Sequence, residues 1–285
     1  MRKYSQGISL IEIMITLLLS SFLILGITQI YLNYKRSYAF ERSVMRVNDT
    51  ANFAQTTLNR WIYKAGFRRT VDASMEKSFP QATYEGKKGS SFNYTCDFDE
   101  QAVATNLQGG NGFCIRYQAL SSEELDCLGE KVKFAESSDL PFAAPSANDL
   151  VVLAFEYTQD ANKNQGSIWC SNLNPKTTVG RIEILDHIAD ATLEFGWAQS
   201  VAHQYDKKVD IYTPVSEWKG KPNNLVRSIR YSLLVSSKEN VADTKSEGIL
   251  NLWKEQKSTT KALEKDKKQI YEIVNATYVL RGIMP

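Results

Sequence analysis

The sequence predicts an α+β protein in which one long N-terminal helix packs on an antiparallel β-sheet domain. Up to about residue 66, an apolar segment is followed by an amphipathic stripe, and the first proline is Pro80. After residue 67 the chain changes to short segments of alternating polarity, which are typical of strands. With 285 residues, 43% of them hydrophobic and 23% charged, the domain can bury a sizeable core.

Residues 8–30 form an apolar segment, ISLIEIMITLLLSSFLILGITQI, long enough to cross a hydrocarbon core of ~30 Å as a helix. Residues 1–7, MRKYSQG, form a short basic leader, which favours a cytoplasmic N-terminus and an exported C-terminal body. A secretory signal would carry a small-residue cleavage site after the apolar run, but Ser20 and Ser21 lie inside it. We therefore expect a single span that stays on the protein, with a periplasmic C-terminus.

Residues 31–66 should continue the same helix with one apolar face. Its stripe recurs at alternating steps of three and four residues: Val44, Val47, Ala51, Ala54, Leu58, Trp61 and Ala65. Gly66 is the expected C-cap. A helix from Ile8 to about Ala65 would be roughly 85 Å long, with its first half in lipid or a filament core and its second half on the domain.

Glu12 is the one charged residue in the apolar segment. A charge costs ~2.5–3.5 kcal/mol at the bilayer centre and less near the interface. The carboxylate either reaches the headgroups by snorkelling or has a specific function.

The globular part, residues 67–285, should be rich in strands. The clearest candidates are residues 149–155, 191–197, 229–235 and 274–280. Two stretches break this pattern, namely residues 90–135, with three cysteines and the glycine-rich run 109–112, and the charged insert at about 237–268. The apolar island in the insert, residues 249–253, indicates either a short helix in a solvated mobile loop or a patch that docks a partner.

The four cysteines, Cys96, Cys114, Cys127 and Cys170, all follow the apolar segment, and none forms a C-x-x-C pair. In an oxidising periplasm they are expected to form disulfides. Four cysteines allow three connectivities, and the sequence does not choose among them. The pairing of Cys96 with Cys114 and of Cys127 with Cys170 is our working prediction.

Sequence patterns for catalysis or cofactor binding are weak. The net charge of +2 argues against a nucleic-acid-binding protein. Residues 109–112 lack the Lys-Ser/Thr of a phosphate loop, and no G-x-S-x-G occurs. His187 and His203 are isolated from each other and from the cysteines. We expect no catalytic residue, no cofactor and no metal centre.

Two acidic segments bear on calcium. The run that begins at Asp160 starts like a calcium loop, but its glycine comes one residue late, at Gly166, and Ser171 stands where a glutamate is needed. A hairpin tip is the better interpretation there. Weak calcium binding by Asp97, Asp99 and Glu100 stays open as a minor alternative.

Residues 7–12, GISLIE, resemble the class III signal of type IV pilins and pseudopilins. The resemblance implies that prepilin peptidase cuts after Gly7 and methylates the new N-terminus at Ile8, a position where the family usually has phenylalanine. It also implies that Glu12 meets the N-terminal amine of a neighbouring subunit during assembly, since an ammonium would neutralise a carboxylate buried among helices.

The rest of the chain has a weaker resemblance to PilW-type minor pilins. It rests on residues 64–67, KAGF, at the helix end, on the cysteine-bearing segments 114–119 and 127–129, and on the late strands 226–235 and 278–281. Gly282 stands where the family ending usually has asparagine. The implied fold is the type IV pilin-like fold.

The implied function is that of a minor pilin that primes assembly of a type IV pilus within a tip complex, and not that of an enzyme. The implied partners are other minor pilins, the major pilin and, as a further candidate, a large tip adhesin. The protein would lie in the bacterial inner membrane and then at the pilus tip, with roles in adhesion and twitching motility. The alternative is a J-type pseudopilin of a type II secretion system, which shares the signal and the helix.

Overall fold

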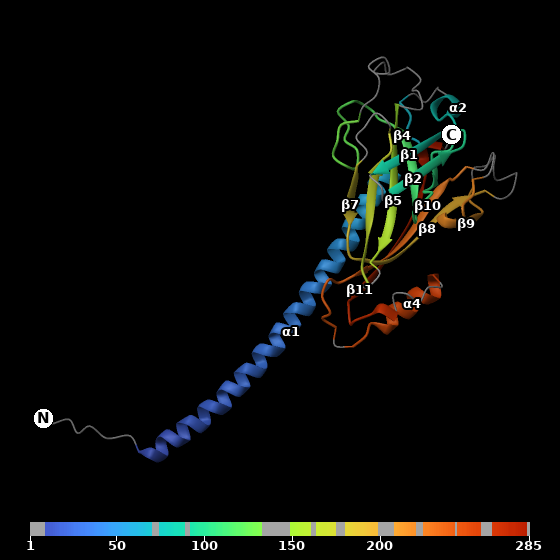
Figure 1. The fold of residues 1–285 in the computed structure, drawn as a ribbon. Coiled ribbons are helices and arrows are strands. Elements are labelled where there is room, and N and C mark those ends of the chain that lie inside the picture. The colour runs from blue at the N-terminus through green and yellow to red at the C-terminus, as the bar shows by residue number, and fades with distance from the viewer. Residues whose placement is uncertain are drawn as a thin grey trace.

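A computed structural model describes residues 9–69, 74–88, 92–132, 149–160, 164–174, 180–198, 208–220, 225–242, 244–257 and 264–283. A single long helix, α1 (Leu10–Ile62), projects from a domain of antiparallel sheets (Figure 1). The α+β class predicted from the sequence is therefore confirmed. Residues 1–8, which include the leader and the proposed cleavage site, lie outside the described residues, as does His203.

The helix ends three residues earlier than predicted, at Ile62 instead of Ala65. The next turn is tighter than an α-helical turn, because the amide of Ala65 donates to the carbonyl of Ile62, three residues before it. Gly66 has a positive φ of 76°, and its amide donates to the carbonyl of Arg116, 3.0 Å away on a neighbouring strand. Since this bond turns the backbone toward the sheet, Gly66 ends the turn that follows the helix.

Gly66 also meets the C-terminal end of the chain. An ideal Cβ on Gly282 would lie 2.1 Å from the carbonyl oxygen of Gly66, so that only glycine fits at position 282 without a backbone shift. Next to it, the guanidinium of Arg281 lies 5.0 Å from the ring centroid of Tyr63. The departure at Gly282 noted in the sequence thus has a packing reason.

The strands that the structure describes all pair antiparallel, in three sheets. A hairpin is formed by β1 (Ala82–Lys88) and β2 (Phe92–Phe98). The five-stranded sheet has the order β3 (Ala104–Asn106), β4 (Gly112–Gln118), β5 (Leu150–Gln159), β6 (Gly166–Asn172) and β7 (Arg181–Leu185). The four-stranded sheet has the order β11 (Tyr271–Val279), β10 (Ser228–Ser236), β8 (Ile188–Trp197) and β9 (Ile211–Pro214). Short helical turns are α2 (Met75–Ser78), η3 (Val215–Glu217) and η4 (Arg281–Ile283).

The four strongest strand predictions are confirmed, as β5, β8, β10 and β11. The stretch 90–135, which breaks the pattern in the sequence, contains β2, β3 and β4. The expected hairpin tip lies between the paired strands β5 and β6, where the amide of Asp160 donates to the carbonyl of Gln165.

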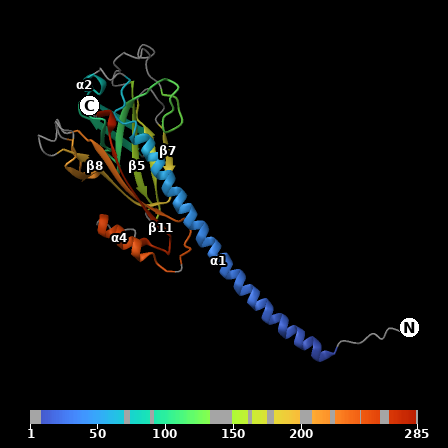
Figure 2. The ribbon, with the colours of Figure 1, turned by 180° about the vertical axis from the view of Figure 1, so that it is seen from behind.

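The second half of α1 lies against β10, β11 and β7 (Figures 1 and 2). Six residues of the predicted stripe are buried, namely Val47, Ala51, Ala54, Leu58, Trp61 and Ala65. Val44 is only half-buried, and the neighbouring Ser43 is buried instead. One polar contact adds to the packing, because the hydroxyl of Tyr231 on β10 donates to Oδ1 of Asn59 at 2.9 Å.

The insert at 237–268 contains a short helix, α4 (Glu247–Lys257). Its apolar island packs on the protein's own sheet, because Leu250 and Trp253 are buried in a small cluster with Leu234 and Tyr271. The indole of Trp253 also donates to Asp190 on β8 at 3.0 Å. The short helix expected in the insert is therefore confirmed. Leu250 and Trp253 of the island are buried within the chain, whereas Leu252 is 46% exposed, so the docking of a partner there stays a prediction.

Candidate functional site

The first half of α1 has an apolar surface on which no other described part of the chain packs. Every residue from Leu10 to Tyr38 is exposed, and these include leucine, isoleucine and phenylalanine side chains on all sides of the helix. Figures 1 and 2 show this half standing clear of the domain. A helix that is apolar all round is stable only when lipid or other helices surround it. Among the described residues, α1 is the helix long and apolar enough to cross a membrane.

Four hydroxyl groups between Leu10 and Ile30 donate to carbonyls of the helix itself. Thr16 donates to the carbonyl of Ile13 at 2.9 Å, and Thr28 donates to that of Ile24 at 2.7 Å. Ser20 and Ser21 donate in the same way, to Thr16 and Leu18. These hydroxyls therefore need no water and add little to the cost of entering a membrane.

Glu12 is the exception. It lies in the first turn of α1, where its amide donates to the carbonyl of Ser9 at 3.0 Å. Its side chain is exposed, and its carboxylate has no partner among the residues that the structure describes. The helix dipole favours a negative charge at this end, but only by ~0.3–1 kcal/mol. A cation from outside the described chain would complete this site.

The other predicted processing residues, Gly7 and Ile8, lie outside the described residues. Glu12 follows Ile8 by four positions in the sequence, and all four cysteines lie in the β-rich domain. The predicted sites thus form two separate groups, one at the free end of the helix and one in the domain.

The domain has the two disulfides of the working prediction, Cys96–Cys114 and Cys127–Cys170. Cys96 on β2 and Cys114 on β4 have Cα atoms 6.0 Å apart. This bond joins the β1–β2 hairpin to the five-stranded sheet. The hydroxyl of Tyr94 on β2 also donates to Glu156 on β5 at 2.6 Å, and Thr95 forms an isolated bridge with Gln108, between β3 and β4.

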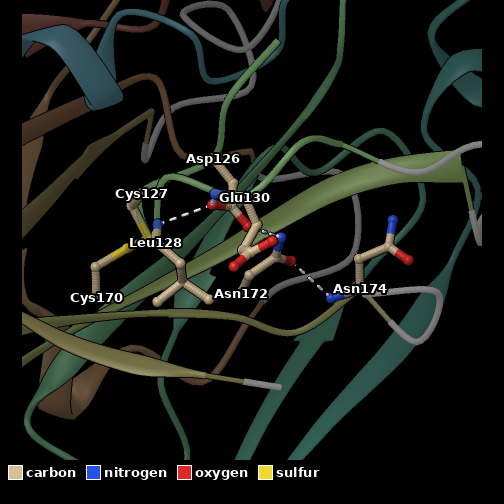
Figure 3. Close-up of a disulfide and its surroundings, with 7 residues drawn as sticks. All are labelled: Asp126, Cys127, Leu128, Glu130, Cys170, Asn172 and Asn174. Atoms are coloured by element: carbon tan, nitrogen blue, oxygen red, sulfur yellow. Dashed lines mark hydrogen bonds between the residues drawn. A yellow bond between two sulfur atoms is a disulfide. The ribbon is translucent and has the colours of Figure 1, made fainter. Parts of the chain in front are cut away.

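The second disulfide fixes a loop on β6, and Asp126 holds the same loop by hydrogen bonds (Figure 3). Oδ1 of Asp126 accepts from the amides of Leu128 and Glu130, at 2.8 and 3.0 Å. Oδ2 accepts from the amide group of Asn172 on β6 at 2.6 Å. Because Asp126 is buried and fully bonded, its role is to position the loop.

The guanidinium of Arg116, which the sequence analysis did not single out, connects β4 to residues 79–80 and 99–102. Arg116 on β4 is fully buried and donates to four backbone carbonyls, those of Phe79, Pro80, Asp99 and Ala102. Burial lowers its pKa to about 10, which still leaves it charged at neutral pH. Its position in a mostly apolar strand, GFCIRYQ, was the one sequence signal for this role.

Among the described residues, no three His, Cys, Asp or Glu side chains gather closely enough to hold a metal ion. Of the acidic residues considered for calcium, Asp97 accepts a hydrogen bond from Thr83 at 2.7 Å, and Asp160 lies at the β5–β6 turn. His187 lies 2.7 Å from the carboxylate of Asp186.

Comparison of the chain with family models, with curated proteins and with solved structures gives no match.

Proposed function

We propose that this protein is a type IV pilin-like subunit, specifically a minor pilin that primes pilus assembly within a tip complex. The observation that carries the proposal is the division of α1 into an exposed apolar half, with one unpartnered carboxylate, and a half packed on a disulfide-bonded domain. The first half suits a membrane before assembly and a bundle of helices after it. The domain suits an oxidising compartment outside that membrane.

Glu12 supplies the specificity of the proposal. An apolar anchor alone needs no carboxylate, and a carboxylate placed among packed helices is stable only when it is paired or protonated. The resemblance of residues 7–12 to the class III signal identifies the partner as the N-terminal amine of a neighbouring subunit. Prepilin peptidase would create that amine at Ile8 and methylate it.

The size of the domain supports a minor subunit at the tip. Residues 67–285 follow the helix, and a body of this size on every subunit would crowd the surface of a shaft, whereas one copy at the tip has free space above it. Other minor pilins and the major pilin are then the proposed partners. Copy number in sheared pili distinguishes a tip subunit from a shaft subunit. A J-type pseudopilin would have the same helix, and co-purification with pilus components or with secretion components distinguishes these two alternatives.

Intact-mass measurement on protein extracted from membranes tests the processing. We expect a chain that has lost residues 1–7 and gained one methyl group. A mature protein that still begins at Met1 would contradict the proposal.

Quantitative mass spectrometry of sheared pili tests the position. We expect far fewer copies of this protein than of the major pilin, and a large loss of surface pili when the gene is deleted, with partial recovery when retraction is blocked. A stoichiometry comparable to that of the major pilin would make the protein a shaft component.

A further inference from the structure

The face of the four-stranded sheet that points away from α1 carries a cavity with charged walls. On β10, Tyr231 points toward α1, where its hydroxyl reaches Asn59. Its neighbours Arg230 and Ser232 therefore lie on the opposite face, since successive side chains of a strand alternate. Figure 1 shows α4 below this sheet and β9 beside it.

Helix α4 covers only one end of this face. Trp253 packs on Leu234 and bonds Asp190, which face each other across β10 and β8. Beyond them lie two cross-strand rows of polar residues: Glu194, Arg230 and Thr277 in one row, and Thr192, Ser232 and Asn275 in the other. Asn275 and Thr277 are exposed, whereas Ser232 is buried. These rows line a cavity of about 800 Å³, with Lys257 of α4 on one wall and Pro214 on another. This volume lies in the range of ligand-binding pockets.

The charges in the cavity do not balance. Arg230 donates to both carboxylate oxygens of Glu194, at 2.7 and 2.8 Å, and lies over the ring of Tyr212 at 4.0 Å. Lys257 is left with a longer contact, 3.9 Å from Oε2 of Glu194. The side chain of Lys257 is only 14% exposed, and its burial lowers the pKa of the ammonium. Two cations thus share one carboxylate, which leaves Lys257 as the group that an anion would stabilise.

The remaining lining is rich in groups that both donate and accept hydrogen bonds. Asn275 and Thr277 are exposed and supply amide and hydroxyl groups, whereas Ser232 is buried and the shielded Oγ1 of Thr192 has no partner among the described residues. None of the lining residues is an exposed large hydrophobic side chain. A protein partner is usually anchored by apolar or aromatic side chains, so this lining favours a small hydroxylated ligand over a docked protein.

We propose that this cavity binds a carboxylated saccharide, with the carboxylate at Lys257 and the sugar hydroxyls at the exposed Asn275 and Thr277 of β11. The ion pair of Arg230 with Glu194 forms the rigid floor, because its bidentate geometry and the ring of Tyr212 fix the guanidinium. The site faces away from α1, so the ligand is accessible whether the helix lies in lipid or against other helices.

Isothermal titration calorimetry on the full-length chain in detergent tests this site, with trigalacturonic acid as the probe. We expect binding that weakens as salt is added, and a loss of about tenfold or more in affinity for Lys257→Gln, because a charge-assisted hydrogen bond is removed. Lys254→Gln is the matched control, since Lys254 is exposed on the same helix and does not line the cavity. This control should bind as the unchanged protein does.

Two further probes decide the chemistry. The fully methyl-esterified trigalacturonate keeps the sugar rings but lacks the charges, and it should bind at least about tenfold more weakly. Triglutamate carries carboxylates without sugar hydroxyls and should not compete. Equal binding of the methyl ester, equal loss in both lysine variants, stronger binding of triglutamate, or no binding of trigalacturonic acid at millimolar concentration would each overturn the proposal.

Discussion

The two halves of α1 belong to one continuous helix but are stabilised in different ways. From Leu10 to Ile30 apolar side chains surround the helix and are exposed, whereas from Ser43 to Ile62 one stripe is buried and the opposite side stays exposed. The buried stripe of the second half packs against β10 and β11. The first half has none within the described chain, so lipid or neighbouring helices must supply it.

This difference indicates that the packed half of α1 contributes to the stability of the domain, whereas the exposed half contributes to contacts outside it. A substitution in the packed half should change the free energy of unfolding of the domain. The same type of substitution in the exposed half should leave the domain unchanged and affect only the membrane or the assembly. Matched pairs of variants along α1 test this division.

Removing the Cys127–Cys170 disulfide should have the largest effect on the domain. With a sequence separation of 43 between the two cysteines, the chain-entropy account gives about 4 kcal/mol of lost stability. Chemical denaturation of a Cys127→Ser/Cys170→Ser variant measures the loss, and circular dichroism should show the exposed half of α1 still helical. An unchanged free energy of unfolding would mean that Asp126 and Asn172 hold the loop without the disulfide.

Leu58→Ala should come next, because Leu58 is 1% exposed in the interface between α1 and the sheet. Losing its side chain there should lower the free energy of unfolding by about 3 kcal/mol. Leu18→Ala is the matched control, since Leu18 is 58% exposed in the apolar half. Equal destabilisation of the domain by both variants would contradict the division of the helix.

Tyr231→Phe should have the smallest effect, about 1 kcal/mol, because it removes one hydrogen bond, from the Tyr231 hydroxyl to Asn59, and keeps the ring. Tyr34→Phe in the exposed half serves as its control and should leave the melting temperature of the domain unchanged. If Tyr231→Phe also melts at the original temperature, the packing of the stripe alone holds the helix on the sheet.

Much of the fold was predictable because periodicity reports local geometry. The three- and four-residue spacing from Val47 to Ala65 identified the buried stripe, and alternation identified β10 and β11. The end of α1 was less predictable, because the bond from Gly66 to Arg116 is a long-range contact that no local pattern encodes. The role of the insert was also hidden, since only the register of β8 and β10 shows that Leu234 and Asp190 lie under Trp253.

Of the two candidate sites, one could be predicted from the sequence and the other could not. Glu12 was visible in the sequence because a charge in an apolar run is rare. The cavity on the sheet was not, because Glu194, Arg230 and Lys257 are far apart in sequence and ordinary in composition. Only the pairing of Glu194 with Arg230 across two strands, together with the end of α4, brings them together.

Glu12→Ala is the variant that tests the central claim most directly, namely that the exposed half of α1 is completed by neighbouring subunits. Glu41→Ala is its control, since Glu41 is exposed on the same helix beyond the apolar segment. Surface pili should be counted in strains that carry each variant as the only copy. We expect normal membrane insertion and processing of both, normal piliation with Glu41→Ala and a sharp loss with Glu12→Ala. Normal piliation with Glu12→Ala would contradict the account and leave the carboxylate as a group that merely snorkels to the headgroups.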